Sequence, residues 1–440
     1  MKRNAARKQF GYSMLGWCAM ACCSAFADEP AAKASHVRVV EENGAYRLQV
    51  NGAPFYIKGA GMSGDEQDAL AERGANSFRT WDTGLDRERV TAMLDRAQHN
   101  RLMVAMGIAV GKERHGFDYD DENAVREQQE RILREVRLYK DHPAVLMWVV
   151  GNELNLEHRN PKVWDAIGAI AEAIHRVDPD HPVMTTLAGI DAPLIHEIRT
   201  RAPALDLIGI QLYGDIEALP QKLRDSQWTG PYVVTEWGPT GHWESPLTTW
   251  KAAVEEDASR KALRLAQRYQ RYIAADTRQG LGSYVFLWGQ KQERTPTWYG
   301  LFLESGESTP SVDVMQYLWT GRWPANRAPS ITPITVNGQD ATRSVTLAPG
   351  SWNDAVVESR DPDGDAVSYR WLLREESRAV SIGGDPETLP DAVDTGMQVE
   401  QGRLRFRAPE RPAAYRLFVE AHDGKGHAAY ANFPLQVAAH

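Results

Sequence analysis

The sequence contains very little cysteine. Its 440 residues include three cysteines, and all three lie between Cys18 and Cys23. Everything after Cys23 is free of thiols and disulfides. The stability of that part of the chain must therefore come from packing alone.

The sequence also lacks an excess of basic charge and long apolar runs. Its formal net charge is −9 and its pI about 5.8, which gives no electrostatic footprint for nucleic acid. No stretch after residue 27 is long and apolar enough to span a bilayer. Hydrophobic residues make up 42% and charged residues 25%, as is ordinary for soluble globular proteins. A neutral ligand would suit this charge better than a polyanion.

The first 27 residues have the features of a signal peptide. Basic residues between Lys2 and Lys8 precede a mostly apolar stretch, and Ala25-Phe26-Ala27 fits a small-x-small cleavage site. Cleavage there would remove four basic and no acidic residues, so the net charge would change from −9 to −13. We therefore expect an exported protein, either periplasmic or secreted. A lipid anchor on Cys22 is an alternative, because the residues before it weakly resemble a lipoprotein processing site.

Short apolar runs alternate with helical patterns between residues 37 and 323. This alternation is typical of parallel strands joined by crossover helices. The predicted strands cover residues 55–59, 77–81, 103–108, 145–150, 183–186, 207–212, 232–235 and 283–287. The predicted helices cover residues 87–98, 124–139, 161–177 and 259–275. Eight such strands predict an α/β fold, a (β/α)8 TIM barrel, with catalytic groups at the carboxyl ends of the strands.

Two smaller parts flank the predicted barrel. After a linker at residues 28–36, a hairpin around Asn43-Gly44 is expected to cap the amino-terminal end of the barrel. Residues 324–329 read as a stiff linker, and residues 330–440 show period-two alternation with turn signals. We expect the latter to form a small all-β sandwich of immunoglobulin type, with Trp352, Tyr369, Trp371 and Tyr415 facing its core.

Two glutamates each close an apolar run. Glu153 follows the strand that ends in Val149-Val150, and Glu236 follows Val233-Val234. A buried strand does not normally end on a carboxylate unless the carboxylate has a function. Two carboxyls brought into one cleft are the minimum equipment for hydrolysing a glycosidic bond, one as acid and the other as nucleophile or base.

Several motifs at strand ends occur in one order along the chain. They are residues 51–59, Arg79, Gly151-Asn152-Glu153, Tyr213, Thr235-Glu236-Trp237-Gly238 and Trp288. Together they resemble clan A glycoside hydrolases, above all family 2 β-glycosidase barrels and the fungal β-1,3-glucanosyltransferases. The resemblance covers about residues 48 to 322.

The resemblance implies a role for each motif residue. Glu153 corresponds to the acid/base and Glu236 to the nucleophile. Arg79 would keep the nucleophile ionised, and Tyr213 would donate a hydrogen bond to it. Asn152 would hold the sugar 2-hydroxyl, and the ring of Trp288 would stack on the sugar.

Further side chains are substrate-facing candidates by position alone. They lie at the ends of the predicted strands or in the loops that follow them. They are Trp81, Asp82, His115, Gln211, His242, Trp243, Gln290, Lys291 and Trp298. A histidine that the clan often places after the third or sixth strand is not next to Tyr213, which leaves recognition of the outer hydroxyls open.

The run Asp361-Pro362-Asp363-Gly364-Asp365 has two readings. Alternate carboxylates could ligate Ca²⁺, but the distal glutamate of an EF-hand loop is missing. The same run suits a tight turn between strands, which is the reading we favour because the stretch resembles PKD and cadherin-like repeats. The domain around it is expected to act as a spacer or to dock against the barrel.

Taken together, these features predict an exported retaining β-glycoside hydrolase that cleaves a β-linked glucan or related glycan without a metal or organic cofactor. One alternative is a transglycosylase, in which an acceptor sugar replaces water. A second is a glycan-binding surface protein without activity. The sugar, the linkage, endo or exo action and the oligomeric state stay open.

Overall fold

The computed structural model describes residues 34–438, and these form one compact unit. The predicted signal peptide and the lipid anchor on Cys22 lie outside the described residues. Within the described part, no helix has both the length and the apolar character needed to cross a membrane. The predicted domain boundaries stay a prediction.

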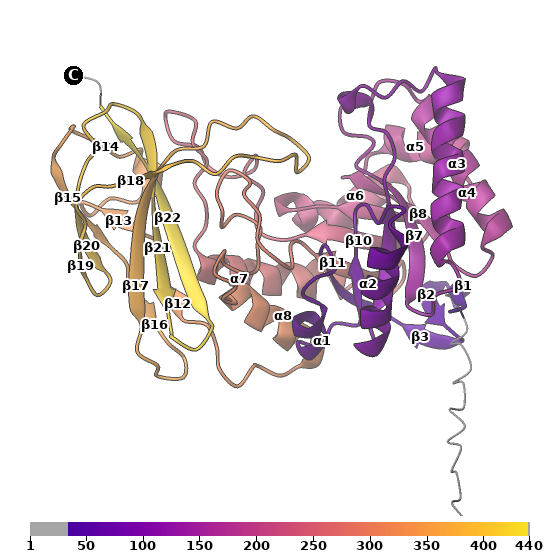
Figure 1. The fold of residues 1–440 in the computed structure, drawn as a ribbon, viewed down its shortest axis with the longest axis horizontal. Helices are drawn as coiled ribbons and strands as arrows, with labels where there is room; N and C mark the ends of the chain where they lie inside the picture. Colours follow the sequence, from indigo (N-terminus) through magenta and orange to yellow (C-terminus); the bar gives the residue numbers. More distant parts are fainter. Residues whose placement is uncertain (1–33, 439–440) are drawn as a thin grey trace, which may run out of the picture. The chain divides into compact units, whose positions relative to one another are not determined.

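Eight parallel strands close into a barrel, drawn from indigo to salmon in Figure 1. In chain order they are β4 (Ile57–Gly61), β5 (Ser77–Arg79), β6 (Met103–Ile108), β7 (Val145–Asn152), β8 (Val183–Ala188), β9 (Leu207–Gln211), β10 (Tyr232–Trp237) and β11 (Gly280–Val285). Each strand pairs with its neighbour in sequence, and β11 pairs with β4. The predicted TIM barrel is confirmed.

The last strand begins three residues earlier than its pattern predicts. Its opening residues Gly280, Leu281 and Gly282 read as a turn in sequence but pair with β10 and β4. Gly282 has a φ of +118°, and a Cβ there would lie 2.2 Å from the carbonyl oxygen of Ile57. Only glycine therefore lets the two strands approach at this point.

Helices follow the barrel strands, and aspartates begin several of them. They are α1 (Gln67–Glu72), α2 (Arg87–His99), α3 (Glu122–Tyr139), α4 (Lys162–Val177), α5 (Ala192–Arg201), α6 (Leu219–Ser226), α7 (Ala258–Arg268) and α8 (Pro310–Thr320). The side chains of Asp86, Asp121, Asp191 and Asp257 accept a hydrogen bond from backbone N–H groups in the first turn of α2, α3, α5 and α7. The pattern identified α2, α3, α4 and α7, whereas it missed α1, α5, α6 and α8.

A three-stranded sheet covers the amino-terminal end of the barrel. It consists of β1 (Val37–Glu42), β2 (Ala45–Val50) and β3 (Ala53–Phe55), with the predicted turn between β1 and β2. Backbone hydrogen bonds join Val37 to Asp180, just before β8, and Tyr46 to Arg278, just before β11. The expected capping hairpin is therefore present.

The carboxyl-terminal part is an all-β sandwich. One sheet has the order β13-β15-β20-β19 and the other β14-β22-β21-β17-β18, with β12 and β16 paired beside them. The strands are β12 (Ser330–Ile331), β13 (Thr335–Val336), β14 (Thr346–Leu347), β15 (Trp352–Val356), β16 (Ser359–Arg360), β17 (Ser368–Glu375), β18 (Ala392–Val393), β19 (Gln398–Glu400), β20 (Arg403–Arg407), β21 (Ala414–His422) and β22 (Ala428–Val437). Trp371 and Tyr415 face the core as expected, but Trp352 is 48% exposed, because the alternation of β15 buries Asn353 and Ala355 instead.

A buried polar network joins the sandwich to the barrel. Arg416 on β21 donates to the carbonyl of Ala253 at 2.8 Å, and Asn432 on β22 donates to Glu255 at 2.5 Å. Glu255 pairs in turn with Lys261 on α7, which also contacts Tyr430. Buried charges need such partners, so these contacts favour docking over a spacer role.

Candidate active site

The carboxyl ends of the barrel strands meet at a cleft of about 1220 Å³. Asn152 ends β7, Glu153 follows it, Gln211 ends β9, and Glu236 lies near the end of β10. These four side chains all line the cleft. Arg79, at the end of β5, is fully buried beneath them. The structure therefore brings together, from four strands, the two predicted catalytic glutamates and three residues that were predicted to contact the substrate.

The carboxylate of Glu236 is held by four hydrogen-bond donors. Its Oε1 accepts from Arg79 Nη1 at 2.9 Å, from Trp81 Nε1 at 2.7 Å and from Gln211 Nε2 at 3.1 Å. Its Oε2 accepts from the Tyr213 hydroxyl at 3.1 Å. The ion pair with Arg79 is buried, with side-chain exposures of 0% and 8%. These four donors fix the position of the carboxylate.

Trp81 reaches Glu236 because a glycine lies under it. A Cβ at Gly61, the last residue of β4, would be 2.9 Å from the Trp81 ring. The indole also lies 5.3 Å from the Arg79 guanidinium, as a cation–π pair. Sequence reasoning placed Trp81 among the outer sugar contacts, whereas it contacts the carboxylate itself.

Asn152 is held in position by its own network. Its Oδ1 accepts from Arg79 Nη2 at 2.6 Å, from Gln211 Nε2 at 2.7 Å and from Thr186 Oγ1 at 3.0 Å. With all these donors on the oxygen, the amide NH₂ is free to donate into the cleft. This orientation suits the contact with a sugar hydroxyl that the family resemblance implies.

Glu153 has different surroundings from Glu236. Among the described residues, none donates a hydrogen bond to its carboxylate, although its backbone N–H bonds the Thr186 carbonyl at 3.0 Å. Its φ is +52°, a left-handed conformation that is strained for glutamate and turns the side chain out of the β7 register. Burial, and secondly the charge of Glu236, raise the pKa of Glu153 to about 7. A carboxyl of this kind keeps its proton near neutral pH.

Two cations lie beside Glu153. Arg114 donates to the Glu153 carbonyl at 3.3 Å, and Lys112 lines the cleft. Both lower the pKa of Glu153 against the larger effect of burial. The pKa of Lys112 is itself lowered by burial and by the charge of Arg114. Sequence reasoning missed both residues, since nothing in their local pattern distinguishes them from other loop cations.

Aromatic side chains form the wall beside Glu236. Tyr213 and Phe286 are buried and pack edge to face, with ring centroids 6.1 Å apart. Trp243 is 59% exposed at the rim and packs on Tyr213. Trp288 lines the cleft but is 2% exposed. Phe286 was missed, because an apolar residue at the end of β11 looks like ordinary core.

Two predicted substrate contacts lie elsewhere. Trp298 is 1% exposed and does not line the cleft, since its indole N–H donates to the Thr240 carbonyl and its ring packs behind Tyr299. That prediction was wrong. His115 is exposed beside a separate, shallower hollow and faces Asp385 at 3.4 Å, so it does not line the main cleft either. An aromatic or histidine side chain in a loop can point into the cleft or away from it, and only the packing of the folded chain decides which. The candidates Asp82, His242, Gln290 and Lys291 do line the cleft.

The sandwich contributes a wall to the same cleft. Residues 382–386, in the connection between β17 and β18 (Figure 1), are among its lining. Lys291 donates to the Gly384 carbonyl at 2.8 Å, and Arg294 donates from its backbone to Glu387 at 2.6 Å. The Glu387 side chain is fully buried against Arg294. The second domain thus shapes the site, a contribution that no sequence motif indicated.

The cleft has no set of metal ligands among the described residues. The one group of three or more metal-ligating side chains found within residues 34–438 is Asp361, Asp365 and Asp423, and none of them lines the cleft. The arrangement around Glu153 and Glu236 is instead that of an acid and a fixed carboxylate facing one cavity.

Comparison with known families agrees with this geometry. Residues 69–242 match the model of "Glycosyl hydrolases family 2, TIM barrel domain". The barrel is therefore similar to the barrels of that family, and the match confirms the resemblance inferred from the strand-end motifs. No curated protein matches the sequence.

Solved structures share the fold at low identity. The β-glucuronidase 2 of Bacteroides uniformis, covalently bound to cyclophellitol-6-carboxylate aziridine, is 14% identical with a TM-score of 0.51, over 91% of this chain and 48% of that one. The Bifidobacterium dentium β-glucuronidase, complexed with coumarin-3-O-glucuronide, is 18% identical with a TM-score of 0.50, over 65% and 49%. The chain spans about half the length of these enzymes, and the likeness concerns the fold alone.

Proposed function

We propose that the protein is a retaining β-glycoside hydrolase in which Glu236 is the nucleophile and Glu153 the acid/base. The observation that carries this proposal is the contrast between the two carboxyls. Glu236 accepts four hydrogen bonds, whereas Glu153 accepts none from the described residues and has a pKa raised to about 7. One group is prepared to stay charged and the other to carry a proton.

The reaction then proceeds in two displacements. In the first, Glu236 attacks the anomeric carbon and forms an ester with the sugar, while Glu153 gives its proton to the departing glycosidic oxygen. In the second, Glu153 takes a proton from water, the hydroxide attacks the same carbon, and Glu236 leaves as a carboxylate. Asn152 would bind the 2-hydroxyl in both transition states.

The charge of the cleft favours a neutral glycan. Its lining includes nine carboxyl side chains but three lysines. The acidic residues are Asp65, Glu66, Asp82, Glu153, Asp191, Asp215, Glu236, Glu293 and Asp385, and the lysines are Lys112, Lys222 and Lys291. This negative field would repel a uronate, the sugar acid named in the structurally similar β-glucuronidases. A β-linked glucan or a related neutral glycan therefore suits the site better.

A mechanism-based label tests the assignment. A 2-deoxy-2-fluoro β-glycoside of the correct sugar should form a stable ester, and digestion should recover the label on the peptide that contains Glu236. The sugar is found first with a panel of neutral β-glycosides and β-glucuronides. Label on Glu153, or inversion of anomeric configuration in the product, would contradict the mechanism.

Transglycosylation is a second candidate, and the exposed ring of Trp243 favours it. This tryptophan is 59% exposed at the rim of the cleft, where an acceptor sugar would stack in place of water. Excess oligosaccharide should then give products longer than the substrate, and Trp243→Ala should reduce their share relative to hydrolysis. Equal product ratios in both proteins would contradict an acceptor role. A glycan-binding protein without activity would give no products at all.

We also propose that the protein is exported, on the basis of its first 27 residues. The aminoterminal sequence of the purified protein would test this. It should begin near Asp28, and an intact Met1 in the cell extract would contradict export.

A further inference from the structure

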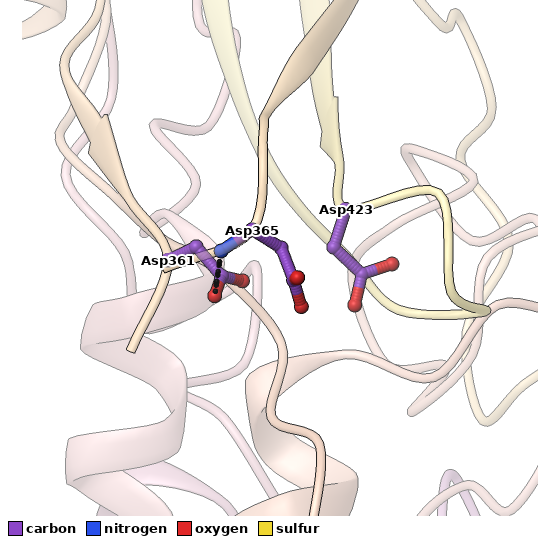
Figure 2. A group of neighbouring side chains, drawn as sticks. All are labelled: Asp361, Asp365 and Asp423. Atoms are coloured by element: carbon purple, nitrogen blue, oxygen red, sulfur yellow. Dashed lines mark hydrogen bonds between the residues drawn. The ribbon is translucent and has the colours of Figure 1, made fainter. Parts of the chain in front are cut away.

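Two turns of the sandwich meet the segment that links it to the barrel. The first follows β16 and holds Asp361 and Asp365, and the second joins β21 to β22 and holds Asp423. Figure 2 shows the three carboxylates side by side, with Asp365 between the other two. One oxygen from each carboxylate lies within 4.8 Å of those from the other two. Two oxygens on one Ca²⁺ ion, each at 2.3–2.6 Å, would be separated by no more than about this distance.

Part of this cluster is buried and has no partner. Asp361 is 7% exposed, and its Oδ1 accepts the backbone N–H groups of Asp363 and Asp365, at 2.8 and 3.0 Å. Within residues 34–438, its Oδ2 is buried with no hydrogen-bond partner, and so is Oδ2 of Asp365. The N–H groups of the turn orient Asp361 so that its second oxygen is directed toward the other carboxylates. A buried oxygen of this kind is costly unless something binds it.

The charges around the cluster do not balance. Lys425 contacts Asp365 at 2.6 Å, but its side chain is 58% exposed. Asp423 accepts from Asn326 at 2.6 Å and lies 3.4 Å from His427 Nδ1. Three carboxylates with one solvent-exposed ammonium leave negative charge at a buried site. A divalent cation with oxygen ligands would compensate it.

We propose that Asp361, Asp365 and Asp423 bind a Ca²⁺ ion at the joint between the sandwich and the barrel. The three carboxylates supply the charged ligands, and backbone carbonyls and water complete the coordination shell. Ca²⁺ fits better than Mg²⁺, because it accepts irregular sets of six to eight oxygens. A turn at residues 361–365 is compatible with this proposal, because the turn orients the carboxylate ligands.

The ion would fix the position of the sandwich on the barrel. The turn with Asp423 pairs with the barrel segment around Ser308, whose N–H donates to the Gly426 carbonyl at 3.1 Å and whose carbonyl accepts from Ala428 at 3.0 Å. The backbone N–H of Arg327 in the linker donates to Asp363 at 2.8 Å. Calcium would therefore stabilise the contacts among the two turns of the sandwich, the linker and the barrel.

Titration of the full-length protein tests the site directly. After treatment with EDTA and its removal, isothermal titration with CaCl₂ should show one site with a Kd between roughly 10⁻⁶ and 10⁻³ M. Saturating Ca²⁺ should raise the Tm by about 3 °C at a hundredfold excess over Kd. MgCl₂ at equal concentration should give a weaker response. No heat with CaCl₂ and no change in Tm would overturn the proposal, and equal binding of Mg²⁺ would overturn the assignment to calcium.

A matched pair of variants separates binding from folding. Asp365→Asn should abolish the Ca²⁺ response while its Tm in EDTA stays at or above that of the wild type, because a repelling charge is gone. Asp363→Asn, in the same turn, keeps an oxygen for the Arg327 N–H and should bind Ca²⁺ as the wild type does. An unchanged Ca²⁺ response in Asp365→Asn, or an equal loss in Asp363→Asn, would overturn the proposal. These readouts do not depend on glycosidase activity.

Discussion

At the ends of β7 and β10, two glutamates line the same cleft but have different neighbours. At the end of β10, Glu236 meets Arg79, Trp81, Gln211 and Tyr213, all of which donate to it. After β7, Glu153 leaves the strand with a φ of +52° and is buried near the charge of Glu236, with Lys112 and Arg114 beside it and no hydrogen-bond donor among the described residues. The difference teaches that the neighbours of a glutamate, and not the residue type, decide whether its carboxyl is held by donors or has a raised pKa.

The largest effect on activity should come from replacing Glu236. Glu236→Gln keeps the shape of the side chain but removes the nucleophile, and kcat should fall by about 10⁴-fold or more. Steady-state kinetics on the best substrate of the panel measure this. Glu172→Gln, on the exposed face of α4, is the control and should keep wild-type activity. Activity within tenfold of the wild type in Glu236→Gln would rule out its role as nucleophile.

The proton on Glu153 should determine how kcat/KM depends on pH. With the pKa of Glu153 raised to about 7, kcat/KM should decline as pH rises above about 7. Glu153→Gln should lower kcat by about 10²- to 10⁴-fold for substrates with poor leaving groups and remove that decline. A basic limb that survives unchanged in Glu153→Gln would assign it to another group.

The same carboxyl should also affect stability, and the sign follows from its raised pKa. The folded state binds this proton more tightly than the unfolded state, whose carboxyl has the ordinary value of 4.5. The stability it contributes is therefore present below about pH 4.5 and lost as pH rises through about 7. Between pH 5 and 8 the Tm of the wild type should fall relative to Glu153→Gln.

Glu135 on α3 is the matched control for this pH test. Burial raises its pKa to about 7 as well, but it lies outside the lining of the cleft. Glu135→Gln should change the dependence of Tm on pH and leave the pH profile of kcat/KM alone. A shift of the activity profile in Glu135→Gln would show that activity follows stability and not the cleft carboxyl.

Arg79 sharpens the comparison, because it contacts the charged glutamate and also orients Asn152. Arg79→Met should lower kcat by about 10²- to 10³-fold, as is typical when a buried donor to a charged reacting group is lost. Arg96→Met is the control, since the pair of Arg96 with Asp68 is exposed and far from the barrel interior. Similar kinetic losses in both variants would indicate a general effect of removing arginine.

The smallest effect on activity should come from loosening residues 382–386, the part of the sandwich that lines the cleft. Glu387→Gln weakens the buried pair with Arg294 and should loosen residues 382–386. We expect KM to rise about 3- to 10-fold with kcat within about twofold, since binding and not chemistry is affected. Glu400→Gln, exposed on β19, should change neither constant. A fall in kcat without a change in KM would contradict a role in binding alone.

Local pattern was sufficient for the barrel and for the two glutamates at its strand ends. The strands β6 and β7 are apolar runs bounded by turns, and α2 and α3 show helical periodicity, so their existence follows from sequence. The short helices α1 and α6 and the proline-started α5 and α8 lack a long periodic stretch and were missed. Glu153 and Glu236 could be named because strand ends on one edge of a barrel must meet, whereas Arg79 was named through the family resemblance.

Residues whose role depends on distant partners could not be named from sequence. Trp81, Trp298 and Phe286 are aromatic residues near strand ends, yet one bonds a carboxylate, one is core and one forms a wall. Their positions depend on neighbours that are distant in the sequence, such as Glu236, 155 residues from Trp81, and Thr240, 58 residues from Trp298. Sequence spacing carries no information on such contacts.

By itself, the sequence determined the barrel, the order of its strands and the two glutamates, because periodicity and strand ends are local properties that packing only has to complete. The tertiary structure alone decided which glutamate is surrounded by donors, that residues 382–386 of the sandwich line the cleft, and that Asp423 joins Asp361 and Asp365. Burial, hydrogen bonding and charge pairing depend on distances in space, and the chain sets these only when it folds.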